Sequence, residues 1–315
     1  MISLVTGAAG FVGSHLCSAL LDAGERVRGI DCFTDYYERS RKEQNLAPLL
    51  ERPGFSFYEE HLLDAPIASM LGDVRVVYHL AGQPGVRASW GREFDLYTRN
   101  NVLVTQRLLE GCKASSEVEK FVYASSSSVY GDAESFPTVE SARPAPRSPY
   151  GVTKLAAEHL CELYRANFGI PTVSLRLFTV YGPGQRPDMA FTRLVQAALE
   201  GRPFELYGDG EQTRDFTFVD DVVDAFLTAA RVSWCGVANV GGGARTSMRD
   251  VLAIVEGLCG AIRVEHRPVQ PGDVRDTSAD TTVARSVLGY QPSVSLPEGL
   301  LAMVSSERTR LLASI

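Results

Sequence analysis

The chain has 315 residues, of which 45% are hydrophobic and 22% charged, and its formal net charge is −7. These values are ordinary for a globular protein with one large domain or two coupled domains, and they argue against a broad nucleic-acid surface. No apolar run reaches transmembrane length and the chain starts directly in a strand-like run, so we expect a cytoplasmic protein without a membrane segment.

The first predicted element is a short apolar strand at residues 2–6, which leads directly into a glycine-rich turn. Gly7, Gly10 and Gly13 occupy this turn, and an amphipathic helix is predicted at residues 14–21. Strand, glycine-rich turn and helix in this order are typical of a βαβ opening, in which the backbone and the helix N-terminus approach a pyrophosphate. The spacing departs from the commoner Gly-x-Gly-x-x-Gly, so the turn alone is weak evidence.

The second predicted strand, residues 26–30, ends at Asp31. An acid at this position of a βαβ unit hydrogen-bonds the adenosine ribose hydroxyls, and its carboxylate repels a 2′-phosphate. NAD is therefore favoured over NADP as the cofactor. The alternative is an ordinary solvated aspartate at the end of a strand.

Further strands are predicted at residues 55–58, 74–80 and 121–124, and long amphipathic helices at residues 101–112 and 154–168. Strands and helices thus alternate along the first half of the chain. This alternation predicts an α/β fold with a Rossmann-like, doubly wound parallel sheet.

A serine run at residues 125–128 follows one of these strands, at the carboxyl edge of the sheet, where open α/β folds bind ligands. Tyr150 and Lys154 are four residues apart, so on a helix the ammonium lies close to the phenol. A free tyrosine has a pKa of about 10 and is a poor base at neutral pH, and a nearby cation lowers that pKa. The spacing alone also occurs by chance, but together with the serines it predicts a catalytic pair.

The pattern becomes irregular after a strand-like run at residues 173–178, and glycine and proline breaks are frequent from there on. We expect a Rossmann domain at residues 1–178, with a returning segment at about residues 215–240. A smaller, irregular α/β substrate-binding lobe is expected at residues 179–315.

The six cysteines and five histidines show no spacing typical of a metal site. Most cysteines lie in apolar surroundings, so reduced thiols are expected. We therefore expect no metal.

These motifs together resemble the extended short-chain dehydrogenases/reductases of the nucleotide-sugar epimerase/dehydratase family. The residues that carry the resemblance are Gly7, Gly10, Gly13, Asp31, the serine run with residues 129–131, Tyr150, Lys154, residues 214–216 and residues 219–221. Within this family, residues 83–91 and 179–190 are most similar to the corresponding segments of UDP-glucuronic acid 4-epimerases.

The resemblance implies a tightly held NAD and a UDP-sugar substrate. Around NAD it places Gly7, Gly10, Phe11, Val12, Gly13, Asp31, Leu80, Ala81, Asn101, Tyr150, Lys154 and Phe178. Around the UDP-sugar it places Pro84, Gly85, Arg87, Ser126, Ser127, Ser128, Thr179, Arg186, Arg214 and Arg275. It also implies a homodimer formed through the helices predicted at residues 101–112 and 154–168.

The reaction that the resemblance implies is a transient oxidation of the sugar at carbon 4, catalysed by Ser126, Tyr150 and Lys154. Tyr150 takes the hydroxyl proton while hydride passes to NAD, and the 4-keto sugar turns over and receives the hydride on its other face. Ser127 and Ser128 stand where related dehydratases carry an acid pair and UDP-glucuronate decarboxylases carry a glutamate. Because a hydroxyl cannot act as a carboxylate base, epimerisation is favoured.

The substrate assignment depends mainly on Arg186. A guanidinium in the sugar pocket would bind a carboxylate at carbon 6 through two hydrogen bonds, whereas a neutral hydroxymethyl group would leave the charge without a partner. A solvated loop arginine is the alternative. The other functions that remain open are a UDP-glucose/UDP-galactose 4-epimerase, a UDP-glucuronate decarboxylase and a catalytically silent NAD-binding regulator.

Overall fold

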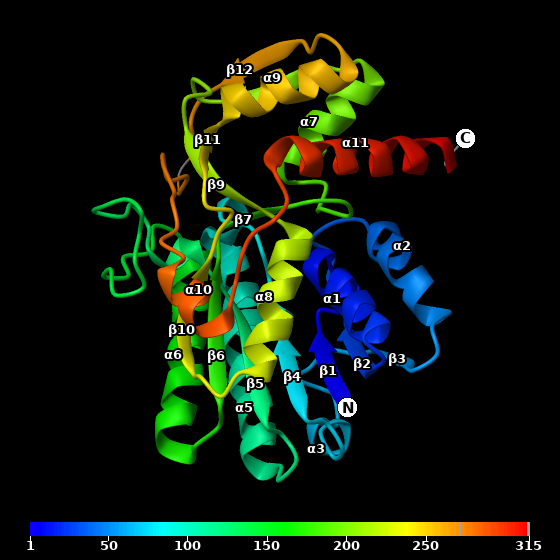
Figure 1. The fold of residues 1–315 in the computed structure, drawn as a ribbon, viewed down its shortest axis with the longest axis vertical. Helices are drawn as coiled ribbons and strands as arrows, with labels where there is room; N and C mark the ends of the chain where they lie inside the picture. Colours follow the sequence, from blue (N-terminus) through cyan, green and yellow to red (C-terminus); the bar gives the residue numbers. More distant parts are fainter. Residues whose placement is uncertain (271, 314–315) are drawn as a thin grey trace.

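The computed structural model describes residues 1–270 and 272–313 (Figure 1). Its centre is a seven-stranded parallel sheet, which confirms the predicted doubly wound α/β fold. In spatial order the strands are β10 (Gly236–Val240), β6 (Thr172–Leu177), β5 (Lys120–Ser126), β4 (Val76–His79), β1 (Ile2–Thr6), β2 (Arg26–Asp31) and β3 (Phe55–Glu59).

The central strands are apolar at consecutive positions because helices cover both faces of the sheet. In β1, for example, Leu4 packs on one face and Val5 on the other. The first face belongs to α3 (Ile67–Met70), α5 (Val104–Ala114) and α6 (Pro149–Phe168). The second belongs to α1 (Phe11–Asp22) and α8 (Val219–Arg231), which lie in front of the sheet in Figure 1.

The order of the strands reverses between β1 and β4, which are hydrogen-bonded neighbours although two strands separate them in the sequence. Beyond the carboxyl ends of two such strands the connecting loops run in opposite directions and leave a crevice. The glycine-rich turn follows β1 here and leads into α1, and the serine run begins in the last two residues of β5. The topology therefore brings the main predicted motifs to one edge of the sheet.

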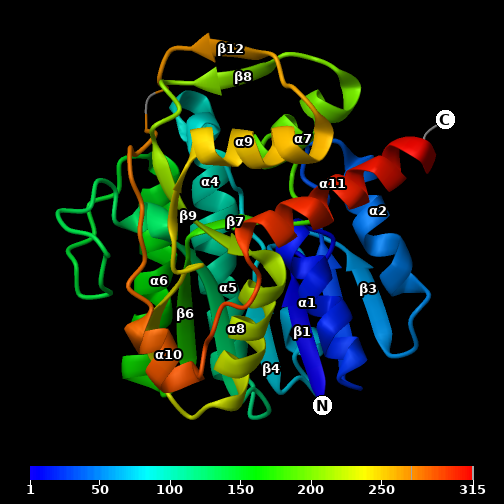
Figure 2. The same ribbon diagram turned by 45° about the horizontal axis from the view of Figure 1, so that its top comes forward.

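The second half of the chain adds smaller elements above this edge. A three-stranded sheet contains β7 (Thr179–Tyr181), β9 (Thr213–Phe218) and β11 (Arg245–Ser247), and β8 (Phe204–Tyr207) pairs with β12 (Val264–Arg267). Helices α7 (Ala190–Glu200), α9 (Met248–Cys259) and α11 (Leu296–Ala313) belong to this part, whereas α10 (Thr282–Leu288) packs against β10 and α8 beside the central sheet. Figure 2 shows the β8–β12 pair on the far side of α7 and α9 from the central sheet.

Along the sequence, the remaining helical segments follow strands of the first half. They are α2 (Arg39–Leu50), α4 (Phe94–Tyr97), the short 3₁₀ turns Arg87–Ser89, Gly91–Glu93 and Ser127–Val129, and a π-helical turn, Thr98–Leu103. The helix expected at residues 101–112 therefore starts earlier and is π-helical in its first part. In the described part of the chain, every helix is too short or too polar to cross a membrane.

A buried ion pair ties α6 to the central sheet. Arg176 of β6 donates to both carboxylate oxygens of Glu158 in α6, at 3.0 and 2.6 Å, and both side chains are at most 5% exposed. Glu158 also accepts a hydrogen bond of 2.6 Å from Ser125 at the end of β5. Glu158 lies one helical turn beyond Lys154, so this pair fixes the helix that carries the predicted catalytic residues.

Replacement of Glu158 by glutamine leaves the Arg176 guanidinium buried without a counter-ion. Breaking a buried pair in this way costs about 3 kcal/mol. We expect the Glu158→Gln protein to lose about that much free energy of unfolding in urea denaturation followed by circular dichroism. The matched control is Glu162→Gln on the same helix, which breaks the exposed pair with Arg165 and should cost less than about 1 kcal/mol. Equal losses in the two variants would contradict the role assigned to the buried pair.

Candidate active site

A cavity of about 440 Å³ runs along the carboxyl edge of the central sheet, from Asp31 and His61 at one end to Arg186 at the other. It brings together most of the predicted site residues. The predicted residues that line it are Gly7, Gly10, Phe11, Val12, Gly13, Asp31, Leu80, Ala81, Pro84, Gly85, Ser126, Ser127, Ser128, Tyr150, Lys154, Phe178, Thr179 and Arg186. Arg87, Asn101, Arg214 and Arg275 lie outside this lining.

The glycine-rich turn has room for no side chain at two of its positions. A Cβ atom on Gly13 would lie 2.0 Å from the carbonyl oxygen of Gly7, and one on Gly7, whose φ is +73°, would lie 2.9 Å from the amide nitrogen of Ala81. Helix α1 begins at Phe11, so Gly13 lies in its first turn, and the helix has no side-chain cap and no acidic residue in that turn. Its N-terminal amide groups therefore face the cavity without a competing carboxylate, which suits a pyrophosphate.

Asp31 ends β2 as a largely buried carboxylate. Its Oδ1 accepts hydrogen bonds from the backbone amide of Phe33 at 2.9 Å and from the Lys42 ammonium at 3.3 Å, and Lys42 is itself buried. The second carboxylate oxygen can accept from a ribose hydroxyl. Lys42 balances the charge of Asp31, and the sequence analysis did not identify it because it lies eleven residues downstream in α2.

Tyr150 stands in the first turn of α6 beside the serine run. Ser148 caps this helix by accepting from the amide of Gly151 at 3.1 Å. Gly151 has a packing role, because a Cβ atom there would lie 2.6 Å from the carbonyl oxygen of Ser128. The close approach of helix and serine run brings the Ser126 hydroxyl near the Tyr150 phenol, where it acts to lower the pKa of Tyr150. Ser126 also accepts from the Ser128 amide at 3.1 Å.

The pKa values of Tyr150 and Lys154 do not follow the expectation that Lys154 lowers the pKa of Tyr150. Burial raises the pKa of Tyr150, and the groups that oppose this effect are the Ser126 hydroxyl and the Arg186 guanidinium. Lys154 is buried rather than solvated, which lowers its pKa to about 8, and its ammonium lies 4.6 Å from the centre of the Tyr123 ring. The expectation therefore fails for the protein by itself, because desolvation outweighs the nearby positive charges.

The buried His79 is hydrogen-bonded to Thr6, which holds the cavity-lining residues Leu80 and Ala81. Thr6 accepts hydrogen bonds from the amides of Leu80 and Ala81, at 3.2 and 3.0 Å, so its own proton goes to Nδ1 of His79 at 2.8 Å. His79 Nε2 then donates to Thr105 at 2.9 Å, and Thr105 donates to the Asn101 carbonyl at 2.7 Å. Burial lowers the pKa of His79 to about 3, so the ring stays neutral in this chain of hydrogen bonds.

Asn101 holds a loop and does not line the cavity. Its side chain accepts from the Gln83 amide at 2.6 Å and donates to the Gln83 carbonyl at 3.1 Å and to Thr153 at 2.9 Å. The neighbouring Asn100 lines the cavity instead and lies 3.0 Å from Nε2 of His61. The π-helical turn changes the angular spacing of side chains, so helical periodicity could not place these two residues.

The end of the cavity near Arg186 is shaped by tyrosines that the sequence analysis did not identify. The Tyr97 hydroxyl donates to the carbonyl oxygens of Pro84 and Gly85, at 2.7 and 2.8 Å, and its ring meets the Tyr150 ring edge-on. Tyr36 occupies the space that a side chain on Gly85 would need, since a Cβ atom there would lie 2.0 Å from the Tyr36 hydroxyl.

Arg186 already has a counter-ion in the protein. Its Nε and Nη2 atoms each donate to a different carboxylate oxygen of Asp188, both at 3.0 Å. The expectation that a neutral sugar would leave this charge without a partner is therefore wrong, because Asp188 supplies the partner. An arginine and an aspartate two residues apart in a loop gave no sequence signal that they would pair.

The other predicted arginines contact protein groups at the rim. Arg87 pairs with Asp273 at 2.6 Å, and Arg275 pairs with Asp209 at 3.2 Å. The Arg214 guanidinium donates to three backbone carbonyl oxygens, at 2.5 to 2.9 Å, which ties β9 to residues 274–275. Their predicted contacts with a diphosphate stay predictions.

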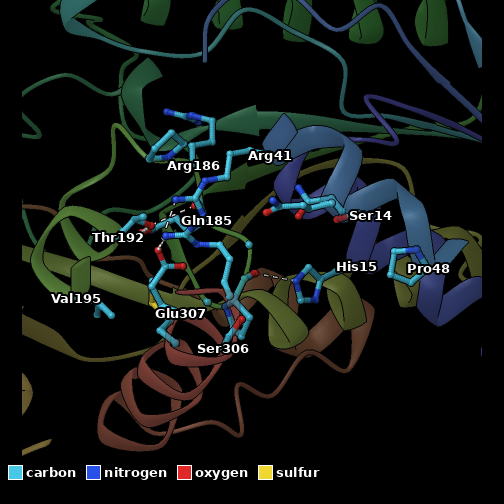
Figure 3. Close-up of a pocket in the computed structure, with 18 of the residues that line it drawn as sticks. Ser14, His15, Arg41, Pro48, Gln185, Arg186, Thr192, Val195, Ser306 and Glu307 are labelled. Carbon is cyan, nitrogen blue, oxygen red and sulfur yellow. Dashed lines mark hydrogen bonds and ion pairs between the residues drawn. The ribbon is translucent and has the colours of Figure 1, made fainter. Parts of the chain in front are cut away.

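A second cavity of about 400 Å³ lies between α1, α2, α7, α11 and the loop at residues 182–187 (Figure 3). In it Glu307 of α11 accepts from Arg41 of α2 at 3.5 Å and from Gln196 of α7 at 2.6 Å. Arg186 lines both cavities. The loop that carries Arg186 is thus the wall between them.

Comparison with known proteins identifies the family. A family model described as the NAD dependent epimerase/dehydratase family matches residues 3–241. The chain belongs to this family. Its cofactor is accordingly NAD, and the glycine turn, the open N-terminus of α1 and Asp31 fit that molecule. Among residues 1–270 and 272–313, no cluster of histidine, cysteine, aspartate or glutamate could hold a metal ion.

Three individual relatives cover nearly the whole chain. The structure of UDP-glucuronic acid 4-epimerase from Bacillus cereus with UDP-glucuronic acid and NAD is 45% identical, with a TM-score of 0.95 over 98% of this chain and 100% of that one. MoeE5 with NAD and either UDP-glucose or UDP-glucuronic acid is 42% identical, with TM-scores of 0.88 and 0.89, over 99% and 98% of this chain and 100% of MoeE5. A protein of Bacillus subtilis (strain 168) named "Uncharacterized UDP-glucose epimerase YtcB" is 46% identical over 94% of this chain and 95% of its own length.

Asp31 provides a test of the cofactor site. Replacing it with alanine removes the ribose acceptor and leaves Lys42 without its counter-ion, so we expect NAD to bind at least about tenfold more weakly. The measurement is the NAD released on denaturation of the purified protein, together with the dissociation constant of NAD. The matched control is Asp35→Ala, which removes the same charge from an exposed position in the same loop. The prediction fails if both variants retain wild-type NAD.

Proposed function

We propose that the protein is an NAD-dependent 4-epimerase of a UDP-sugar that interconverts UDP-glucuronate and UDP-galacturonate. The observation that carries the proposal is one cavity that joins the Ser126–Tyr150 pair to Arg186. The Bacillus cereus epimerase, with UDP-glucuronic acid and NAD, supports the choice of substrate. We further propose that residues 1–178, with residues 215–240, hold NAD and that residues 179–315 bind the nucleotide sugar.

Tyr150 is the proposed base for the hydroxyl at carbon 4. The Ser126 hydroxyl donates to the phenolic oxygen and thereby stabilises the phenolate, which is the form that accepts a proton. NAD supplies the hydride acceptor and a further positive charge when it is bound. Lys154 lines the same cavity and has a pKa of about 8, so it carries a proton at neutral pH. Its positive charge adds to that of the bound cofactor.

Ser127 and Ser128 support epimerisation over elimination or decarboxylation. Both line the cavity directly after Ser126. Neither hydroxyl can remove the proton at carbon 5 as a carboxylate would, so the only chemistry this set of side chains provides is proton exchange at the oxygen on carbon 4.

A guanidinium can also protect the uronate. A 4-keto uronate is a β-keto acid, and its carboxylate is lost most readily when the breaking bond is perpendicular to the plane of the ketone. Arg186 would hold the carboxylate by directed hydrogen bonds and restrict this rotation.

A second substrate is favoured by one observation. Because Asp188 neutralises Arg186, the cavity can also accept the neutral sugar of UDP-glucose without an unpaired charge. MoeE5, whose structure contains UDP-glucose in one complex and UDP-glucuronic acid in another, is consistent with either substrate. UDP-glucose and UDP-galactose are therefore the alternative pair.

The direct test is proton NMR of the purified protein with UDP-glucuronate. We expect UDP-galacturonate to accumulate until equilibrium, with no release of carbon dioxide. Tyr150→Phe should reduce turnover at least about a thousandfold, because the base is removed while the ring and its packing stay. UDP-glucose, measured in parallel, reports the alternative substrate. No interconversion of the uronate by the NAD-loaded wild type, or unchanged turnover in Tyr150→Phe, would contradict the proposal.

We also propose that the protein is a homodimer formed through α5 and α6. The two helices lie side by side, and Val152, Leu163 and Phe168 of α6 and Leu103, just before α5, are exposed. Val152 and Leu163 are three helical turns apart and so share one face of α6. Exposed apolar residues grouped in this way are typical of an interface.

Leu163→Asp places a charge in this interface and should convert the dimer into a monomer, because a carboxylate cannot be desolvated there without a partner. Light scattering after size-exclusion chromatography measures the mass. Leu301→Asp, at an equally exposed leucine of α11, is the control and should leave the dimer intact. A wild type that elutes as a monomer would refute the dimer.

A further inference from the structure

Asp188 faces the one guanidinium that the proposed function assigns to the substrate. The Arg186–Asp188 pair uses the Nε–Nη2 edge of the guanidinium, with two hydrogen bonds of 3.0 Å, and leaves the Nη1 edge for another acceptor. The side chains are 21% and 37% exposed, so water screens the pair only in part. Arg186 thus meets the substrate with its charge already balanced.

Tyr36 holds Asp188 in this position. Its hydroxyl donates to Asp188 Oδ2 at 3.3 Å, and the Arg186 guanidinium carbon lies 5.5 Å from the centre of its ring. Gly85 leaves the space that the Tyr36 hydroxyl occupies. The pair is therefore supported from a third segment of the chain and is not a chance contact within one loop.

The backbone that carries the pair is fixed on both sides. Before it, His15 Nε2 lies 2.9 Å from the Pro183 carbonyl oxygen, and the Gln185 side chain donates to the Val180 carbonyl oxygen at 2.9 Å. After it, the Thr192 amide and hydroxyl both donate to the Gln185 side chain, at 3.1 and 3.0 Å, as Figure 3 shows. The loop cannot withdraw Asp188 as a unit, so any change must be made by the side chains.

The two possible substrates place different demands on this arrangement. A neutral sugar needs no cation, and Asp188 keeps the Arg186 charge satisfied. A uronate brings a second carboxylate to the same guanidinium and gains its hydrogen bonds against the repulsion of Asp188. The carboxylate of Asp188 therefore weakens binding of the uronate and permits binding of the neutral sugar.

We propose that Asp188 determines the preference between acidic and neutral sugars by supplying the counter-charge of Arg186. This inference rests on the proposed UDP-sugar function, and it adds a specificity-determining residue that does not act on the reacting atoms. The protein without Asp188 is a more selective uronate binder than the wild type.

The experiment compares the dissociation constants of UDP-glucuronate and UDP-glucose, measured by calorimetry on the NAD-loaded protein with Tyr150→Phe to stop turnover. In Asp188→Asn the amide oxygen still accepts from Arg186, but the like charge is gone. We expect the ratio of the UDP-glucose constant to the UDP-glucuronate constant to rise about tenfold, the scale of one hydrogen bond to a charged group. Asp188→Ala should move the ratio in the same direction.

Two controls isolate the effect. Glu265→Gln also removes a carboxylate that pairs with an arginine two residues away, but that arginine, Arg263, lines neither cavity whereas Arg186 lines both, so the ratio should not change. Arg186→Leu by itself should lower the ratio below the wild-type value, because the uronate loses the guanidinium that binds its carboxylate while the Asp188 charge remains.

A ratio that stays constant or falls in both Asp188 variants would overturn the inference and make Asp188 a positioning residue for Arg186. An Arg186→Leu variant whose ratio equals that of the wild type would also overturn it. Failure of the proposed function is a separate result, since it appears as the absence of UDP-galacturonate with the wild type, whereas this test reads binding alone.

Discussion

Desolvation of charged side chains at the carboxyl edge of the sheet is the constraint on which the rest of the structure depends. Three charged groups there are paired inside the protein: Asp31 with Lys42, Glu158 with Arg176, and Arg186 with Asp188. Such pairing is required because an isolated charge in a low-dielectric interior costs several kcal/mol. The site is therefore defined by its ion pairs as much as by its reacting groups.

The same constraint explains the acidities of the catalytic candidates. Burial raises the pKa of Tyr150 and lowers that of Lys154 to about 8, so in the protein alone both Tyr150 and Lys154 keep their protons at neutral pH. Hydroxyl donation from Ser126 and the positive charge of the bound cofactor act in the opposite direction. We therefore expect the phenolate to form when the cofactor is in place.

The architecture brings these groups together through backbone packing. Glycine residues at positions 7, 13, 85 and 151 lie where a Cβ atom would meet a neighbouring segment within 3 Å. They let the β1 turn, the loop after β4 and the start of α6 approach one another. The buried series of hydrogen bonds from Thr6 through His79 to Thr105 holds the loop after β4, and all of its members are uncharged. The loop at residues 182–188 brings Arg186 to the same cavity together with its counter-ion, Asp188.

The sequence by itself determined the alternating α/β order, the parallel sheet, the glycine turn, the serine run and the Tyr150–Lys154 pair, because these follow from local periodicity and short spacings, whereas the choice of Ser126 within the run came from the family resemblance. Only the tertiary structure decided which charges meet. Lys42 reaches Asp31, Tyr36 reaches Asp188, and Asn101 turns toward Gln83 through contacts that depend on how distant segments pack and on a π-helical turn. Whether a side chain is desolvated, and by which partner it is balanced, depends on its whole surroundings, and no local pattern in the sequence contains that information.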